Sequence, residues 1–142
     1  MSEYKYILIP IISVLVAQVI KTIIETIEYK RFDVARLFNG SGGMPSSHST
    51  LVVSLVTTIG LNIGTNSIYF AISLILSLVV LYDAMGIRYE TGKQAEVINK
   101  ITKQIKFKEF ISLKEKIGHK PIEVFGGIIT GIVMALILNN II

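Results

Sequence analysis

The sequence predicts an all-α membrane protein, a polytopic bundle of about four transmembrane helices with amphipathic interfacial helices between them. Hydrophobic residues make up 51% of the 142 residues and charged residues only 17%, a composition typical of membrane proteins. The apolar residues are concentrated in long stretches, at roughly 6–20, 51–81 and 124–142, and about 20 such residues cross a bilayer as a helix. We therefore expect a single integral membrane domain over residues 1–142.

Four spans are expected, at about residues 5–27, 47–62, 67–87 and 122–142. The long central apolar stretch is divided at residues 62–66, where asparagine, glycine and threonine are typical of a turn. The first span lacks a small-residue cleavage pattern behind it, so we interpret it as a retained helix and not as a signal peptide. In the last span, Gly127, Gly131 and Ala135 form a stripe of small residues that predicts close helix packing, within the bundle or between subunits of a homo-oligomer.

Two connecting segments carry most of the basic residues, three of them at positions 30–36 and nine at positions 88–120. By the positive-inside rule both segments face the cytoplasm, which places the two termini on the other side of the cell membrane. Most of these charges are expected to set the topology and to contact anionic headgroups. Residues 90–103 have the pattern of an amphipathic helix and residues 107–117 a weaker one, and both are expected to lie in the headgroup region.

His119 and Glu123 are the first candidates for chemistry. Pro121 favours a helix start, which puts Glu123 in the first turn, where a carboxylate can reach back to the imidazole. A carboxylate that keeps one ring nitrogen protonated leaves the other nitrogen free to act as a nucleophile or a base. Alternatively, Glu123 only caps the helix and His119 is a polar residue at headgroup level, and the pattern alone favours neither reading.

The segment GSGGMPSSHS at residues 40–49 precedes the second span. Its glycines and proline can turn the chain sharply, and Ser46 and Ser47 can cap the helix that follows. The free N–H groups of a first helical turn attract an anion, and His48 in that turn is placed to protonate a group leaving the anion. A plain helix cap with a histidine beside it is the alternative. Hydropathy puts His48 and His119, the only two histidines, on the same face of the membrane.

Two sets of polar residues lie within the spans. Asp83 lies near the cytoplasmic end of the third span, where an acid usually faces the protein interior, so we expect a buried cationic partner such as Lys21 or Arg88. In the first span, four polar residues fall on one helical face, which should point into the bundle; they are Gln18, Lys21, Glu25 and Glu28. The chain has no cysteine, which excludes disulfides, thiolate metal sites and a cysteine nucleophile.

Three blocks in this order resemble the small divergent branch of the type 2 phosphatidic acid phosphatase superfamily, which also includes the vanadium haloperoxidases. The blocks are GGMPSSHS at 42–49, YDAMGIRYETGKQAEVIN at 82–99 and GHKPIEVFGG at 118–127. The resemblance implies a two-step phosphoryl transfer on a lipid-linked phosphate or pyrophosphate, with no metal or other cofactor. His119 would attack phosphorus to form a phosphohistidine, Glu123 would orient it, and His48 would protonate the departing oxygen.

The resemblance also implies a phosphate site in which hydroxyl and N–H groups bind phosphate oxygens and a cation balances the transition state. The arginine that the superfamily has six residues before the nucleophile is Leu113 here, and the first superfamily motif is not matched. Arg88 is therefore the best substitute. The phosphate-binding candidates are Gly43, Ser46, Ser47, Arg88, Lys93 and Arg36.

The expected partners are a phosphorylated lipid and the membrane, without nucleic acid. A membrane phosphatase is the first function predicted; a non-catalytic protein that binds or transports a phosphorylated lipid, or a helical oligomer with a structural role, are the alternatives. Catalysis demands that the rings of His48 and His119 flank one phosphate, roughly 5–8 Å apart. Glu123 should then approach the far nitrogen of His119, and at least one basic candidate should point into the same pocket.

Overall fold

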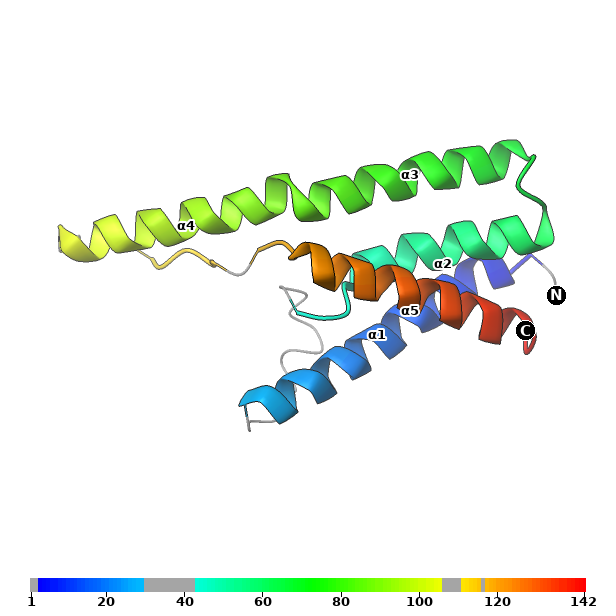
Figure 1. Ribbon diagram of the computed structural model, residues 1–142, viewed down its shortest axis with the longest axis horizontal. Helices are drawn as coiled ribbons and strands as arrows, with labels where there is room; N and C mark the ends of the chain where they lie inside the picture. The colour runs from blue at the N-terminus through cyan, green and yellow to red at the C-terminus, as the bar shows by residue number, and fades with distance from the viewer. Residues whose placement is uncertain (1–2, 30–42, 106–110, 116) are drawn as a thin grey trace.

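The computed structural model describes residues 3–29, 43–105, 111–115 and 117–142. In these ranges every regular element is an α-helix, which confirms the predicted fold class (Figure 1). The five helices are α1 (Lys5–Tyr29), α2 (Ser47–Asn62), α3 (Ile68–Met85), α4 (Ile87–Gln104) and α5 (Pro121–Asn139).

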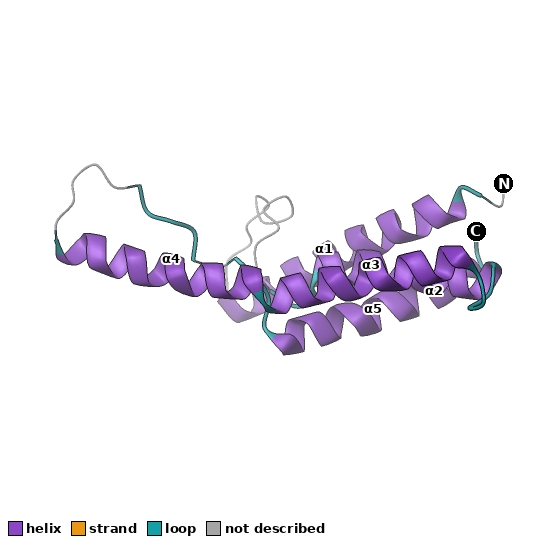
Figure 2. Ribbon diagram, turned by 90° about the horizontal axis from the view of Figure 1, so that it is seen from above, coloured by secondary structure: helices purple, strands orange, loops and turns teal. Residues whose placement is uncertain are grey.

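Helix α2 is the centre of a four-helix bundle and packs against α1, α3 and α5 (Figures 1 and 2). Its small hydroxyl residues make this burial favourable, because each hydroxyl can bond a carbonyl of its own helix. Thr50 and Thr58 are fully buried, and each donates to the carbonyl four residues earlier. Ser77 of α3 donates across the interface to the Val52 carbonyl of α2, at 3.1 Å. These hydroxyls therefore have hydrogen-bond partners within the bundle.

The stripe of small residues in α5 packs against α2 of the same chain. Gly131 approaches the Thr50 carbonyl so closely that an added Cβ would lie 2.9 Å from its oxygen, and at Gly127 an added Cβ would lie 2.5 Å from the Ser46 carbonyl oxygen. Ala135 is fully buried. The stripe thus packs two helices of one chain against each other.

Three segments of the described residues are long and apolar enough to cross a membrane: Lys5–Glu28, Ile68–Gln104 and Pro121–Asn139. They contain three of the four expected spans. The fourth, α2, has 16 residues, or about 24 Å of helix, which is short of a hydrocarbon core of ~30 Å. The turn expected at 62–66 is present between α2 and α3, and the chain termini lie at that same end of the bundle (Figure 1).

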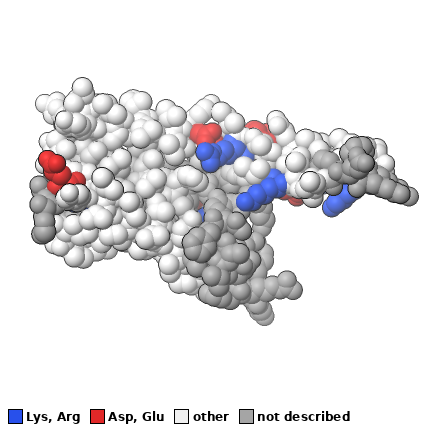
Figure 3. Space-filling model, turned by 180° about the vertical axis from the view of Figure 1, so that it is seen from behind, with Lys and Arg blue, Asp and Glu red and all other residues white. Residues whose placement is uncertain are grey.

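The amphipathic helix expected at residues 90–103 lies within α4. Helix α4 continues the direction of α3 past a break at Gly86 and projects beyond the bundle (Figures 1 and 2). Residues 111–115, expected to be helical, are not in a helix, and residues 107–110 and 116 lie outside the described residues. The reason for the projection is a set of close contacts between α4 and residues 111–119, described below. On the face drawn in Figure 3, charged groups gather at the α3–α4 junction and along α4, whereas the bundle surface is largely uncharged.

Candidate functional site

His119 and Glu123 form a buried pair at the start of α5. Nδ1 of His119 lies 3.1 Å from Oε2 of Glu123, with the two side chains 4% and 18% exposed. The same carboxylate oxygen accepts the N–H of Lys120 at 3.0 Å, and the carboxylate also accepts the N–H of Gly43. Glu123 therefore caps α5 and holds the histidine ring at once. Nε2 of His119 is the ring nitrogen left for chemistry.

His48 faces His119 from the first turn of α2. The two ring centroids are 6.5 Å apart and the ring planes are inclined at 61°, a separation within the roughly 5–8 Å expected for groups flanking one phosphate. Ser46 fixes the start of α2, because its N–H donates to the main-chain carbonyl of Glu123 at 3.0 Å and its hydroxyl accepts the N–H of Ser49 at 3.3 Å. The helix starts that carry the two histidines are thus bound directly to each other.

A cavity of about 420 Å³ contains both histidines. Its charged residues are Asp83 at the end of α3, Arg88 at the start of α4 and Lys114. Arg88 Nε donates to Asp83 Oδ2 at 2.5 Å, so Arg88 is the partner of Asp83, but the two side chains are 50% and 33% exposed and the expected burial of the pair is wrong. Arg88 is also the basic candidate expected in the pocket. The apolar part of the lining includes Val79, Val80 and Ala84 of α3.

Lys114 is a cavity residue that the sequence reasoning missed. It was grouped with the lysines that set the topology, although it directly follows Leu113, the position where the superfamily has its arginine. That adjacency is the one signal that could have identified it. Lys114 and Arg88 give the cavity two cationic side chains, which favours an anionic ligand.

The three residues expected to bind phosphate through hydroxyl and N–H groups do not line the histidine cavity. Ser46 is fully buried and its hydroxyl oxygen caps α2. Ser47 is 7% exposed, and its Oγ is a buried atom without a hydrogen-bond partner among the described residues. Gly43 has φ +90° and its N–H is directed to Glu123. None of these three residues is among the described residues that line the histidine cavity.

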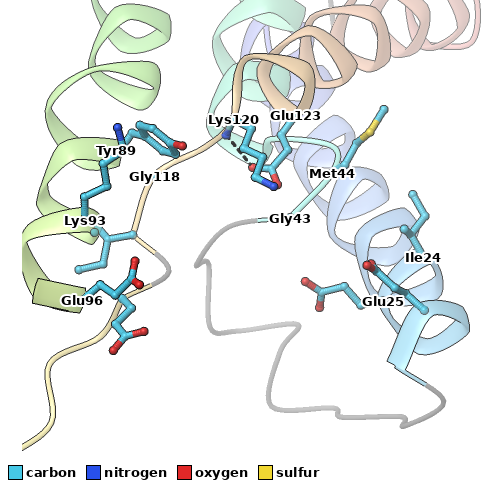
Figure 4. Close-up of a pocket in the computed structure, with 14 residues that line it drawn as sticks. Ile24, Glu25, Gly43, Met44, Tyr89, Lys93, Glu96, Gly118, Lys120 and Glu123 are labelled. Carbon is cyan, nitrogen blue, oxygen red and sulfur yellow. Dashed lines mark hydrogen bonds between the residues drawn. The ribbon is translucent and has the colours of Figure 1, made fainter. Parts of the chain in front are cut away.

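A second cavity of about 380 Å³ lies on the Glu123 side of the pair, between α1 and α4 (Figure 4). Lys93 points to this cavity and not to the histidines; its Nζ binds Glu90 at 2.9 Å and lies 4.6 Å from the centre of the Tyr89 ring. Carboxylates outnumber lysines in the lining, which makes it unfavourable for phosphate. The carboxylates are those of Glu25, Glu28, Glu96, Glu115 and Glu123, and the lysines are Lys93 and Lys120. Arg36, the remaining basic candidate, lies outside the described residues.

Lys21 is buried in α1 at 3% exposure. Its aliphatic carbons lie 3.3 Å from the position that a Cβ on Gly43 would take, and its charge is close enough to interact with those of Glu25 and Glu123. Asp83, for which Lys21 was the other expected partner, binds Arg88 instead. The polar face of α1 does point into the bundle at Lys21, whereas Glu28 at its end is exposed.

Comparison with known proteins agrees with the three sequence blocks. Residues 2–134 match the model of the "Divergent PAP2 family". Over 142 aligned residues the chain is 40% identical to a protein of Bacillus subtilis (strain 168) named "Uncharacterized membrane protein YuiD", covering 89% of this chain and 88% of that one. No solved structure matches the chain significantly. By its matching residues and its paired histidines, this membrane protein belongs to the divergent PAP2 family.

Proposed function

We propose that this protein is a phosphatase that removes phosphate from a lipid-linked phosphate or pyrophosphate through a phosphohistidine intermediate. One observation supports this proposal above the others. Two imidazoles face each other across one cavity at 6.5 Å, and a carboxylate holds the far nitrogen of one of them. A purely structural histidine pair has no need of this asymmetry, whereas a nucleophile and a general acid require it.

In the first step, Nε2 of His119 attacks phosphorus with its lone pair while the bond from phosphorus to the leaving oxygen breaks. Protonated His48 donates its proton to that oxygen, so the product leaves as a neutral alcohol or as a protonated phosphate. Glu123 accepts the Nδ1 hydrogen of His119 and stabilises the positive charge that the ring acquires as the P–N bond forms.

In the second step, water attacks the phosphohistidine from the side that the leaving group has vacated. Neutral His48 takes a proton from this water, the P–N bond breaks, and its electron pair returns to Nε2 of His119. Inorganic phosphate is released and both histidines regain their starting protonation states. The cycle needs one water for each phosphate released.

The cations of the cavity balance the charge that develops on the phosphoryl oxygens. Arg88 offers several fixed N–H donors, which suit phosphate geometry, and Lys114 adds a mobile ammonium group. Ser46, Ser47 and Gly43 contribute indirectly, by building the helix start that carries His48. Lys93 faces the second cavity, so we assign it no contact with the transferred phosphate.

The lining of the cavity supports a lipid as the substrate. Val79 and Val80 belong to the apolar α3, so an apolar chain bound there would continue along a membrane-embedded helix, while the phosphate reaches the cations at the end of the bundle. With α4 and its lysines on the cytoplasmic side, the phosphate would be taken from the cytoplasmic leaflet of the cell membrane.

A non-catalytic protein that binds or transports a phosphorylated lipid is the second candidate. It is favoured by the pairing of Arg88 with Asp83 at 2.5 Å, because an arginine already bound to a carboxylate has less capacity to stabilise a transition state. Both candidates predict binding of a phosphorylated lipid. Only the phosphatase predicts turnover that depends on His119.

The test is phosphate release by the purified protein in lipid nanodiscs, supplied separately with polyprenyl pyrophosphate and phosphatidic acid. The wild type is compared with His119→Ala and His48→Ala, and ³²P-labelled substrate detects a phosphoprotein that is labile in acid. Release and labelling by the wild type but not by His119→Ala would support the phosphatase. Lipid binding without release on either substrate would leave the binding protein as the function.

A further inference from the structure

The second sequence block, residues 82–99, begins in the histidine cavity and ends far from it. Asp83 and Arg88 line the cavity, but residues 89–99 continue along α4 away from the bundle. The reaction described above gives this second half of the block no task. The buried residues of this region indicate a task for it. Three residues of α4 are buried although the helix projects from the bundle: Gly92, Ala95 and Asn99. Ala84, near the end of α3, is buried as well. The spacing of these residues, at three, four, seven and eight positions, puts them on one face of the helices.

A chain segment covers this face. Residues 111–119, of which all but 116 are described, run back from the outer end of α4 to His119, and we name them the return segment (Figure 2). In the middle of the face, Gly92 meets the backbone of the segment, because an added Cβ would lie 2.4 Å from the Glu115 carbonyl oxygen. Only a residue without a side chain allows this approach.

Asn99 holds the outer end of the return segment. Its Oδ1 accepts the N–H of Leu113 at 2.9 Å, and its Nδ2 donates to the carbonyl of the same residue at 2.8 Å. Nδ2 also donates to Oε1 of Glu115 at 2.7 Å. Asn99 is 2% exposed, so three hydrogen bonds made by one buried amide fix this point of the segment strongly.

The inner end of the return segment is attached to the end of α3 through the backbone of His119. Its N–H donates at 3.1 Å to the carbonyl of Ala84, one of the last carbonyls of α3, which have no partner within that helix. Just before it, Gly118 lies against α4, where an added Cβ would be 2.4 Å from the Tyr89 nitrogen (Figure 4). The backbone of His119 therefore binds the same helical face that Asn99 uses further out.

Contacts with α4 follow the return segment between these two attachments. The Glu115 carbonyl lies against Gly92, and Gly118 lies against Tyr89. The N–H of Ile117 donates to the Glu115 carbonyl at 3.0 Å, so the segment is not fully extended. A segment held at successive points on one helix transmits a shift at its outer end to its inner end, whereas an unsupported loop would absorb it.

We propose that Asn99 is a positioning residue for His119. By fixing Leu113 on α4, it sets the register of the return segment along that helix, and through it the place of the His119 ring relative to His48. The effect on turnover rests on the proposed function, whereas the effect on the position of His119 does not. The middle sequence block is then a support for the nucleophile, which explains why it extends to Asn99.

The test uses Asn99→Asp, which keeps the shape, removes the amide donor and sets a carboxylate against Glu115. The rescue variant combines Asn99→Asp with Glu115→Gln, because the new amide donates to the new carboxylate. Asn140→Asp is the control, since Asn140 binds a carbonyl of its own helix at the opposite end of the bundle. Hydrogen exchange of the backbone amides in nanodiscs is measured together with kcat and KM for phosphate release.

In Asn99→Asp we expect at least tenfold faster exchange at Leu113 and at His119, with α2 and α5 unchanged. The kcat should fall about tenfold or more and KM should stay within about twofold, since the cavity lining is intact. The rescue variant should recover most of the exchange protection and most of the kcat, and the Asn140→Asp control should change neither quantity. Unchanged exchange at His119, or an unchanged kcat in a variant whose His119 amide is exposed, would overturn the proposal.

Two further results are decisive. A wild type without phosphate release removes the proposed function, and the exchange at His119 then decides the positioning role alone. If Asn99→Asp does not accumulate, Asn99→Gln replaces it, because that change keeps the amide and moves it outward by about 1.5 Å. It should lower kcat while Leu113 stays protected, and a normal kcat in that variant would contradict the positioning role of Asn99.

Discussion

The main-chain N–H of Ser46 donates a 3.0 Å hydrogen bond to the main-chain carbonyl of Glu123. This bond joins the residue before α2 to the first turn of α5, so the two helix starts that carry His48 and His119 cannot shift independently. Thr50 adds a second link through its hydroxyl, 3.2 Å from the carbonyl oxygen of Gly127. These contacts fix the two helix starts relative to each other, and the Glu123 carboxylate holds the His119 ring between them.

Replacing Glu123 by glutamine should separate its role in orienting His119 from its role in capping α5. Glutamine keeps an oxygen for the Lys120 N–H but carries no charge to stabilise the imidazolium, so phosphate release should fall about 100-fold or more. Thermal unfolding of the purified protein should show a loss of no more than about 1 kcal/mol. Activity near that of the wild type would mean that the carboxylate serves only as a cap.

Gly118 and Gly64 form a matched pair for testing the contact behind His119. Both have a left-handed backbone, with φ +115° and +98°, so alanine at either position costs about 1 kcal/mol or more through strain. At Gly118 the added Cβ would also meet the backbone of α4, whereas at Gly64 no atom lies within 4 Å. Gly118→Ala should therefore abolish phosphate release and Gly64→Ala should leave it intact. Equal activities of the two variants would argue against the contact.

Removing the charge of Asp83 should strengthen the binding of an anion in the histidine cavity. Arg88 would lose its partner and become free for phosphate, an effect of about 1 kcal/mol for a partly exposed pair, or about fivefold in affinity. Isothermal titration of Asp83→Asn with inorganic phosphate or vanadate measures it. The variant Arg88→Ala should weaken the same binding, and an unchanged affinity in both variants would mean that Arg88 does not face the bound anion.

The orientation in the membrane can be tested with single cysteines, because the chain contains none. Lys100→Cys lies on the projecting α4, and Asn66→Cys lies in the turn at the opposite end of the bundle (Figure 1). With α4 in the cytoplasm, an impermeant thiol reagent should label position 66 in intact cells and position 100 only after permeabilisation. Labelling of position 100 but not of position 66 in intact cells would mean that the protein has the opposite orientation in the membrane.

Gly131→Val tests whether the stripe on α5 serves the fold or an oligomer. An added Cβ would lie 2.9 Å from the Thr50 carbonyl oxygen, so the α2–α5 contact must open and stability should fall by about 2 kcal/mol or more. Ile129→Val, at an exposed position of the same helix, should change stability by less than about 0.5 kcal/mol. If Gly131→Val instead changed only the oligomeric state in size-exclusion chromatography, the stripe would be a subunit interface.

Hydropathy and capping signals were sufficient to predict most of the fold. The second span was expected at residues 47–62, and α2 occupies those same residues, because Ser46 is a strong N-cap and an apolar run follows directly. The pairing of His119 with Glu123 was one of two readings that the sequence left open, and the helix start at Pro121 made it geometrically possible. These features depend on residues that are close in sequence.

Features that depend on distant residues were not predictable. Nothing local to residues 90–103 indicates that α4 continues α3, because its direction is set by close approaches at Gly92 and Gly118 that no pattern of hydropathy reveals. Likewise, a serine before a helix can bind a ligand or cap its own helix. The hydroxyl of Ser46 does the second, which the sequence could not distinguish from the first.

The shortness of α2 gives bilayer thickness a part in the chemistry. Asn62 at the far end of α2 accepts a hydrogen bond from Lys5 and donates one to Asn139, a polar cluster that belongs at one water interface. A helix of about 24 Å that begins there brings His48 only to within about 6 Å of the other edge of a ~30 Å core. A phosphate at ordinary headgroup height would have to descend to meet the histidine, or the bilayer would have to thin around the protein. Thinner membranes would bring headgroup and histidine together at lower cost, so the proposed turnover would depend on the surrounding lipid as well as on the residues in the cavity.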